Sequence, residues 1–337
     1  MWELRNRGIA LPAGFVIWVE TGGAVENSGT VVTLCEGEFL FGAAALANSL
    51  QCCGFTGEFL VGLRESGLNA PLLEALFSKD ARRRLKFKLV LEGVDTAMHF
   101  TNYKAKVLTS KLSGDPLCSR AFYLDPDITV LCPWDFVSMW VDAGVALCAD
   151  VNWCMPSDHP IRSQWKAMLW DFGHPVARSP HLYYNGGFIG IHRRDAEFAA
   201  LWDALIDRYG GETNPLDAQG DIAEWRKGGR WNRVFSPNQD TLNMAAMAWP
   251  KAIATLGPDA MGFVPGDTWF PHAIGSRKPW RKRYLVEALR GFPPTTADKA
   301  FWRFCEGPIP VFPWRTIRLR RLQIKVASMV GRIYKRG

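Results

Sequence analysis

The sequence lacks the features that would direct a chain out of the cell or to a structural zinc ion. Its eight cysteines are scattered, with no Cys-x-x-Cys pair and no His spacing of a zinc site, so we expect reduced thiols. The first 30 residues show no charged start followed by an apolar core, which is the signal-peptide pattern. The apolar stretch 136–151 is short and interrupted by Asp142, so it does not predict a membrane span. We therefore expect a cytoplasmic protein.

Acidic residues are absent from the end of the chain. The formal net charge is +7, yet residues 315–337 contain eight basic side chains and no acidic one. Subtracting those eight charges leaves −1 for the other 314 residues. A nucleic-acid-binding protein would spread positive charge over a face, whereas this body is near neutral. We therefore expect no nucleic-acid partner.

The basic tail, residues 314–337, has the pattern of an amphipathic helix. Its apolar residues recur at helical spacing, at Leu322, Val326, Met329, Val330 and Ile333. Basic amphipathic helices lie on anionic lipid surfaces, which predicts peripheral attachment to the inner face of the plasma membrane. The alternative is a helix docked on the protein core with its charges in solvent.

Composition and patterning indicate a globular α/β protein without internal repeats. Hydrophobic residues make up 48% and charged residues 22%, which excludes wholesale disorder. The 15 tryptophans are read as packing residues more readily than as sugar platforms. Strand-like segments alternate with helical ones, as in an open, mostly parallel sheet. The predicted strands are 29–34, 59–63, 86–91, 120–124, 144–149 and 183–192, and the predicted helices are 41–50, 71–78, 102–112 and 195–209; segments 152–182 and 210–233 are expected to be irregular.

Two carboxylates end the predicted strand 120–124. Asp125 and Asp127 stand two residues apart, and ligands of open α/β sheets collect at the carboxyl ends of strands. Such a pair makes a compact oxygen-rich site for Mg²⁺ or Mn²⁺ shared with phosphate oxygens. Taken alone, the triplet is also compatible with a simple turn that Asp125 caps and Pro126 bends.

Further segments, in order along the chain, decide between these readings. AFYLDPDITV resembles the metal-binding strand of nucleotide-sugar glycosyltransferases of the GT-A fold. TLCEGEFLFGAAALANSL, Lys104, YNGGFIGI, NQDTLN and PHAIGSRKPW match the other motifs in the order of glycosyltransferase family 8 and its bacterial relatives. The resemblance covers residues 29–280. It implies an α/β GT-A catalytic domain at 29–313 with a mostly parallel sheet and flanking helices, after an N-terminal extension at 1–28 and before the helical tail.

The resemblance assigns residues to three roles. Asp125, Asp127 and His272 would bind Mn²⁺, or Mg²⁺, as a mixed oxygen and nitrogen ligand set. Gln239, placed under the anomeric carbon, and Asp240 beside it would be catalytic. The donor would contact Glu36, Phe39, Lys104, Asp125, Asn185, Gly186, Gly187, Asn238, Gly275 and Lys278.

Several of these residues have independent physical readings. The ammonium of Lys278 would lie against the donor diphosphate, and the alternative is a solvated surface lysine. Paired glycines inside a strand indicate either a close approach to the backbone or a β-bulge. The segment around Asn238 is also compatible with a helix N-cap, made by Ser236 or Asn238, and both readings can hold together.

The sequence departs from the family pattern at three positions. Glu36 and Phe39 stand where the family has Asp and Tyr at the base, and Asn238 replaces the first Asp of the Asp-Gln-Asp motif. These changes affect donor identity more than reaction class. The function implied is transfer of a sugar from a UDP-sugar to a glycan or glycolipid acceptor, with retention, as in lipopolysaccharide biosynthesis. The alternative is a non-catalytic carbohydrate-binding protein that kept the fold.

Overall fold

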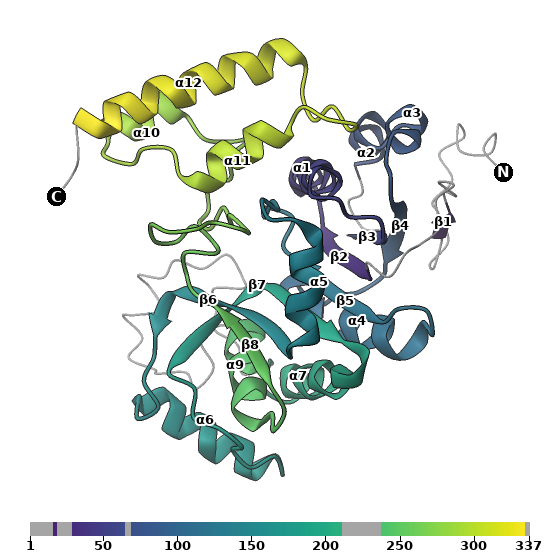
Figure 1. Ribbon diagram of the computed structural model, residues 1–337, viewed down its shortest axis with the longest axis vertical. Helices are drawn as coiled ribbons and strands as arrows, with labels where there is room; N and C mark the ends of the chain where they lie inside the picture. The colour runs from purple at the N-terminus through teal and green to yellow at the C-terminus, as the bar shows by residue number, and fades with distance from the viewer. Residues whose placement is uncertain (1–15, 19–28, 65–68, 211–236, 334–337) are drawn as a thin grey trace.

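The protein is built on one eight-stranded sheet, with strand order β1-β4-β3-β2-β5-β7-β6-β8. The computed structural model describes residues 16–18, 29–64, 69–210 and 237–333 (Figure 1). The strands are β1 (Val16–Trp18), β2 (Thr30–Cys35), β3 (Glu58–Arg64), β4 (Lys88–Val94), β5 (Arg120–Leu124), β6 (Val145–Cys154), β7 (Leu182–His192) and β8 (Ile253–Leu256). The helices are α1 (Phe39–Cys52), α2 (Ala70–Leu76), α3 (Lys79–Arg83), α4 (Phe100–Gly114), α5 (Trp134–Asp142), α6 (Pro160–Asp171), α7 (Ala196–Tyr209), α9 (Pro237–Ala248), α10 (Tyr284–Leu289), α11 (Thr296–Phe304) and α12 (Trp314–Ile333).

The central part of the sheet is parallel, which confirms the predicted α/β class. β4, β3, β2 and β5 pair in parallel, as do β6 and β8. β7 is antiparallel to both β5 and β6, so it reverses the sheet direction beside the strand that carries the Asp pair. At the far edge, β1 pairs antiparallel with β4, so part of the segment 1–28 adds an edge strand.

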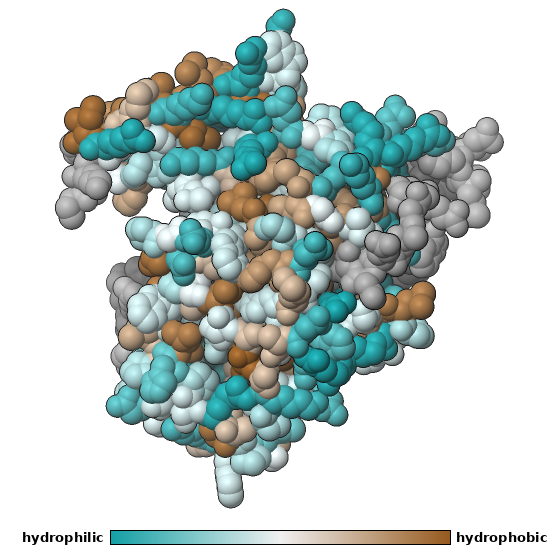
Figure 2. All heavy atoms as spheres, in the orientation of Figure 1, coloured by the Kyte–Doolittle hydropathy of each residue, from teal (hydrophilic) through white to brown (hydrophobic). Residues whose placement is uncertain are grey.

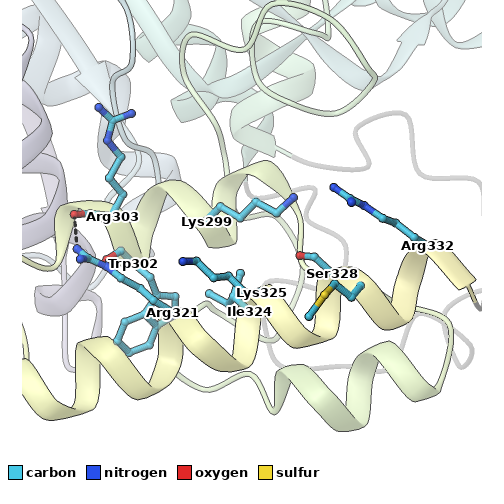
Figure 3. Close-up of a pocket in the computed structure, with 9 residues that line it drawn as sticks. Lys299, Trp302, Arg303, Arg321, Ile324, Lys325, Ser328 and Arg332 are labelled. Atoms are coloured by element: carbon cyan, nitrogen blue, oxygen red, sulfur yellow. Dashed lines mark hydrogen bonds between the residues drawn. The ribbon is translucent and has the colours of Figure 1, made fainter.

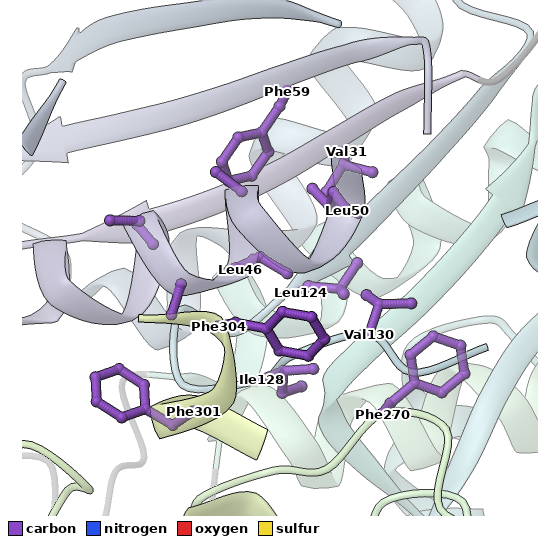
Figure 4. Packing of buried hydrophobic residues seen from close by; sticks show 14 of the residues in the cluster. Val31, Leu46, Leu50, Phe59, Leu124, Ile128, Val130, Phe270, Phe301 and Phe304 are labelled. Carbon is purple, nitrogen blue, oxygen red and sulfur yellow. The ribbon is translucent and has the colours of Figure 1, made fainter. Parts of the chain in front are cut away.

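Alternate strand residues fill two cores, one on each face of the sheet. Val31 of β2 belongs to one core and its neighbour Val32 to the other, as the two-residue period of a strand requires. The first core packs α1, α5 and α11 on the sheet, and Figure 4 shows Phe301 and Phe304 of α11 near Leu46 of α1. The second packs α4, α7 and α9. The sheet is thus covered on both faces, as parallel sheets are.

Small residues let α1 approach the Asp pair closely. A Cβ atom on Gly42 would lie 2.1 Å from the carbonyl oxygen of Pro126, so a side chain there would force the helix away. Alanines follow at positions 43–45, all fully buried. The first turn of α1 is therefore held against the turn that contains the two carboxylates.

The expectation that residues 152–182 are irregular was wrong. β6 continues to Cys154, and α6 covers Pro160–Asp171 with Trp165 fully buried. The His and Pro residues that suggested a loop instead start this helix. His159 accepts a hydrogen bond from the Ile161 amide, and Pro160 occupies a first-turn position, where its missing N–H costs nothing. The other expected loop, 210–233, lies almost entirely outside the described residues.

The C-terminal helices form a layer against α1 (Figure 1). The buried amide of Asn48 donates to the carbonyls of Phe304 and Ile309 and accepts from the Ile309 amide, which clamps the segment after α11 onto α1. α12 then packs on α10 and α11. No helix in the described part of the chain is both long enough and apolar enough to cross a bilayer.

The tail is helical, as expected, but of the predicted apolar stripe only Val330 is partly buried and packs on the core. α12 buries Ile317, Ile324, Ala327 and Gly331 instead. The stripe residues Leu322, Val326, Met329 and Ile333 are all exposed. The helix is therefore docked on the protein, as the second alternative predicts, and its exposed side is apolar; the expected membrane attachment stays a prediction.

Candidate functional site

The Asp pair lies where β5 ends beside β7. The Asp125 amide donates to the Gly187 carbonyl, which ties the first carboxylate to the paired glycines. The chain then turns, and Ile128 forms an isolated bridge with His272, while the Ala273 amide donates to the Asp127 carbonyl. This backbone pairing brings a segment some 145 positions further along the chain against the Asp pair. The Asp pair and His272, which are distant in sequence, are thereby brought side by side in the structure.

One ligand atom from each of Asp125, Asp127 and His272 converges on a common point. The three atoms lie within 4.8 Å of one another. The His272 Nε2 atom is 3.3 Å from Asp127 Oδ1 and 3.6 Å from Asp125 Oδ2. Ligands bound at right angles on an ion of this class are separated by about 3 Å, because each bond is about 2.0–2.3 Å long. The spacing and the donor types therefore fit Mn²⁺ or Mg²⁺.

Two lysines take the remaining carboxylate oxygens. Lys104 Nζ lies 2.7 Å from Asp125 Oδ1, and Lys278 Nζ lies 2.6 Å from Asp127 Oδ2. Each carboxylate thus points one oxygen to a lysine and the other towards His272. The lysines thereby help to fix the orientation of both carboxylates. Lys278 is therefore part of the site, and the reading of it as a solvated surface residue is wrong.

The charge balance favours ionised Asp127. Burial by itself would raise the pKa of this carboxyl, but His272 and Lys278 more than offset that effect, and the pKa lies well below its usual range. Asp127 is consequently a charged carboxylate throughout the physiological pH range. A carboxyl group must be ionised in this way to act as a metal ligand.

The paired glycines of β7, Gly186 and Gly187, each lie close to a different side chain. A Cβ atom on Gly187 would lie 2.6 Å from His272 Cε1, so only glycine allows the imidazole its place. A Cβ atom on Gly186 would lie 3.3 Å from Asn238 Nδ2, at the start of α9. The pairing of β7 with β6 also changes register along this stretch. Close approach and local irregularity, the two alternatives from the sequence, therefore occur together.

Asp150 at the end of the regular part of β6 is a site residue that the sequence reading missed. Its Oδ2 atom accepts from Asn185 Nδ2 at 2.6 Å and from Gln239 Nε2 at 2.9 Å. The Gln239 Oε1 atom accepts from the Gly186 amide, and Asn185 Oδ1 accepts from the Gly187 amide. One buried carboxylate thus orients both amide side chains. No local motif surrounds Asp150, so only its place at a strand end marks it.

Asp240 follows Gln239 in α9 and contacts the hydroxyl of Tyr183. Its buried carboxylate accepts from the Tyr183 hydroxyl at 2.6 Å, and burial followed by the charge of Asp240 raises the pKa of that hydroxyl well above its usual value. Asn238 lies one residue inside α9, and its carbonyl accepts from the Trp202 indole. The first residue proposed to cap this helix, Ser236, lies outside the described residues.

A pocket of about 230 Å³ adjoins the metal ligands and reaches the start of α1. Its walls include Glu36, Phe39 and Lys104 as well as the Asp pair, so the structure brings these expected donor residues together. The Glu36 carboxylate is paired with Arg64, and Phe39 packs edge-on against Trp280 at 5.6 Å. Gly275 has a φ of 92°, a conformation that favours glycine, near the same edge.

The fold and this site together define a GT-A protein with a metal-competent Asp-x-Asp-His centre. Among solved structures, the galactosyltransferase LgtC in complex with donor and acceptor sugar analogues matches 86% of this chain and 99% of its own, at 13% identity and a TM-score of 0.51. The bifunctional glycosyltransferase WbbM matches 89% of this chain and 53% of its own, at 14% identity and a TM-score of 0.50. GlyE of Streptococcus pneumoniae TIGR4 matches 88% of this chain and 64% of its own, at 15% identity and a TM-score of 0.49.

The likenesses to LgtC and WbbM establish the fold, and they confirm the GT-A expectation. The sequence matches no protein-family model and no curated protein. The chain spans about half of the length of WbbM and under two thirds of that of GlyE.

Proposed function

We propose that this protein is a metal-dependent glycosyltransferase that moves a sugar from a UDP-sugar to a glycan or glycolipid acceptor with retention of configuration. One observation carries the proposal. Each carboxylate of the Asp pair gives one oxygen to a lysine and turns the other towards His272 Nε2. A simple turn or a pure packing role needs no such convergence of three ligand atoms with two balancing cations.

A bound Mn²⁺ or Mg²⁺ would neutralise charge that builds on the leaving diphosphate. Asp125, Asp127 and His272 would hold that ion. Once the bound ion balances the negative charge of Asp127, the ammonium group of Lys278 would pair with the diphosphate. Its Nζ atom is also 3.0 Å from the Ala273 carbonyl, and Lys278 lines the pocket.

Retention without a covalent intermediate is supported by the geometry around Gln239. Its amide is oriented at both ends, by Asp150 and by the Gly186 amide. Asp150 is engaged by two amide groups, so it acts as a positioning residue for Gln239. The carboxylate of Asp240 is held by Tyr183. The amide oxygen of Gln239 would stabilise an oxocarbenium-like state while the acceptor attacks from the side of the departing diphosphate.

The acceptor is proposed to be at a membrane, because α12 presents an apolar side to solvent. Leu322, Met329 and Ile333 are 58%, 53% and 90% exposed. Basic residues flank them on the same helix, which is the arrangement of helices that lie on anionic lipid. This attachment would place the enzyme on the inner face of the plasma membrane, as lipopolysaccharide synthesis requires.

The decisive experiment is a screen of nucleotide sugars with and without Mn²⁺. Release of UDP and thermal stabilisation are measured together for each donor. Metal-dependent hydrolysis of one UDP-sugar supports the proposal. Stabilisation without hydrolysis or transfer to any glycan acceptor would identify the alternative, a nucleotide-sugar-binding protein that has lost turnover.

A further inference from the structure

A groove between α11 and α12 is lined by basic side chains and has no carboxylate among its lining residues. Its volume is about 690 Å³. The lining residues are Lys299, Trp302, Arg303, Arg321, Ile324, Lys325, Ser328, Met329 and Arg332 (Figure 3). Positive charge is thus collected in a concave place that is far from the Asp pair in the fold. Such a concentration attracts a polyvalent anion.

The five cations of the groove are not equivalent. Arg321 is neutralised by Glu306 and donates to the carbonyls of Trp302 and Arg303. The guanidinium of Arg303 points away from α12 (Figure 3). Lys299, Lys325 and Arg332 remain, and within the described part of the chain none of them has a carboxylate within ion-pair distance. These three come from two helices and extend along one groove.

The floor of the groove adds two further features. Trp302 and Ile324 are buried there, so the base is apolar. The Ser328 hydroxyl is buried and has no hydrogen-bond partner among the described residues. A ligand with an anionic group and an apolar portion would pair with the cations and lie on the apolar floor.

The groove opens beside the exposed apolar side of α12. Met329 belongs to both, since it lines the groove and is also exposed next to Leu322. α10 and the turn after it add exposed Leu289 and Phe292 at the same end of the molecule. Figure 2 shows apolar side chains over this end next to a row of hydrophilic ones. A free phosphate or a nucleic acid would use the charges alone, whereas a membrane lipid uses both surfaces.

We propose that the groove between α11 and α12 binds the phosphate of an anionic membrane phospholipid. Lys299, Lys325 and Arg332 hold the phosphate oxygens through charge-assisted hydrogen bonds, and the acyl chains lie along the apolar side of α12. The inference rests on the proposed membrane attachment. It adds one specific site for a lipid headgroup to the general attraction between the basic helix and an anionic surface. It is independent of sugar transfer.

The test compares two variants of the full chain that lose the same charge. Lys299→Gln/Lys325→Gln changes the groove, and Arg315→Gln/Arg318→Gln changes exposed basic residues of α12 that do not line it. Sedimentation is measured with phosphatidylcholine vesicles with and without phosphatidylglycerol. We expect the groove variant to lose at least about ten-fold more affinity for the anionic vesicles than the control. Both variants should keep the melting temperature of the parent, because the replaced side chains are exposed.

The other outcomes separate the two proposals. Equal losses would overturn the groove and leave a diffuse attachment, whereas a parent protein that does not sediment with anionic vesicles would overturn both. Calorimetry with soluble dihexanoyl phosphatidylglycerol, with glycerol phosphate and with an oligonucleotide identifies the ligand class. Binding of the lipid alone, lost in the groove variant, supports the site. Equal binding of glycerol phosphate, or tighter binding of an oligonucleotide, would overturn the lipid assignment.

Discussion

The imidazole of His272 lies against the bare backbone of Gly187, so close that a Cβ atom there would be 2.6 Å from His272 Cε1. We expect Gly187→Ala to displace the imidazole and to weaken Mn²⁺ binding at least about ten-fold, as other changes that disorient a ligand do. Manganese affinity is measured by calorimetry. Gly186→Ala is the matched control, because the nearest atom to its Cβ would be the flexible amide of Asn238, at 3.3 Å, and His272 is not among its neighbours. Equal affinities in the two variants would contradict the steric role.

Asp127 is the ligand whose loss should be most damaging. Asp127→Asn keeps the shape but removes the charge that faces His272 and Lys278, so metal-dependent UDP binding should fall at least about 100-fold. The protein should remain folded, as judged by circular dichroism. Asp80→Asn, at an exposed site on α3, should bind normally. Unchanged UDP affinity with Mn²⁺ in the Asp127 variant would sink the metal assignment.

Lys278 tests the link between the carboxylates and the donor. Lys278→Ala should weaken UDP binding about ten-fold or more, the value of a hydrogen bond to a charged group, and leave uridine binding nearly unchanged. The exposed Lys79→Ala serves as the control for a lost surface charge. Calorimetry with both ligands gives the comparison. A similar loss for uridine and UDP would show that Lys278 acts only by supporting the fold.

All eight cysteines are free, as the scattered spacing predicts, and their reactivity should follow burial. Burial raises the pKa of Cys53 and of Cys132 to about 12, which leaves only about one thiolate in 10,000 at pH 8. Exposed Cys52 and Cys154 should therefore be alkylated by iodoacetamide much earlier than these two. Mass spectrometry of timed samples measures the order. Early labelling of Cys132 in the folded protein would contradict its position in the core.

The exposed apolar side of α12 is tested without removing the helix, because truncation would uncover the surface that Ile324 and Ala327 bury. Leu322→Ser/Met329→Ser should lower sedimentation with anionic vesicles at least about ten-fold, since burying such a side chain is worth about 1.5–3 kcal/mol. Leu117→Ser/Met139→Ser changes a pair of the same types elsewhere that is even more exposed. Parallel losses in the two variants would mean that α12 is not the attachment surface.

Part of this site could be predicted from local sequence motifs. The Asp pair at a strand end, the paired glycines and the His-x-x-Gly-x-x-Lys-Pro-Trp segment each have a local signature, and their order predicts that they meet. The structure brings them together through pairing of residues 128 and 272. The edge of the sheet at which the site lies was predictable as well, because the carboxyl ends of parallel strands share one edge.

Other parts depend on contacts that no local pattern contains. Asp150 has no motif around it, and it becomes a site residue only because β6 and β7 change register and place its carboxylate between Asn185 and Gln239. The start of α6 was misread because His159 and Pro160 favour loops as well as first turns of helices. Asp150 is placed by hydrogen bonds to residues distant in sequence, and the start of α6 is set by the capping hydrogen bond to His159.

The sequence by itself determined that the tail is a basic amphipathic helix and that the Asp pair ends a buried strand, because charge and apolar period are local properties. Only the tertiary structure decided which side of α12 is docked. Ile317, Ile324 and Ala327 repeat with helical spacing, and so do Leu322, Val326 and Met329. The spacing alone therefore cannot predict which of these two sides of the helix is buried. Contact with α10 and α11 buries the first set, and the close packing of Gly331 on Pro293 selects that orientation.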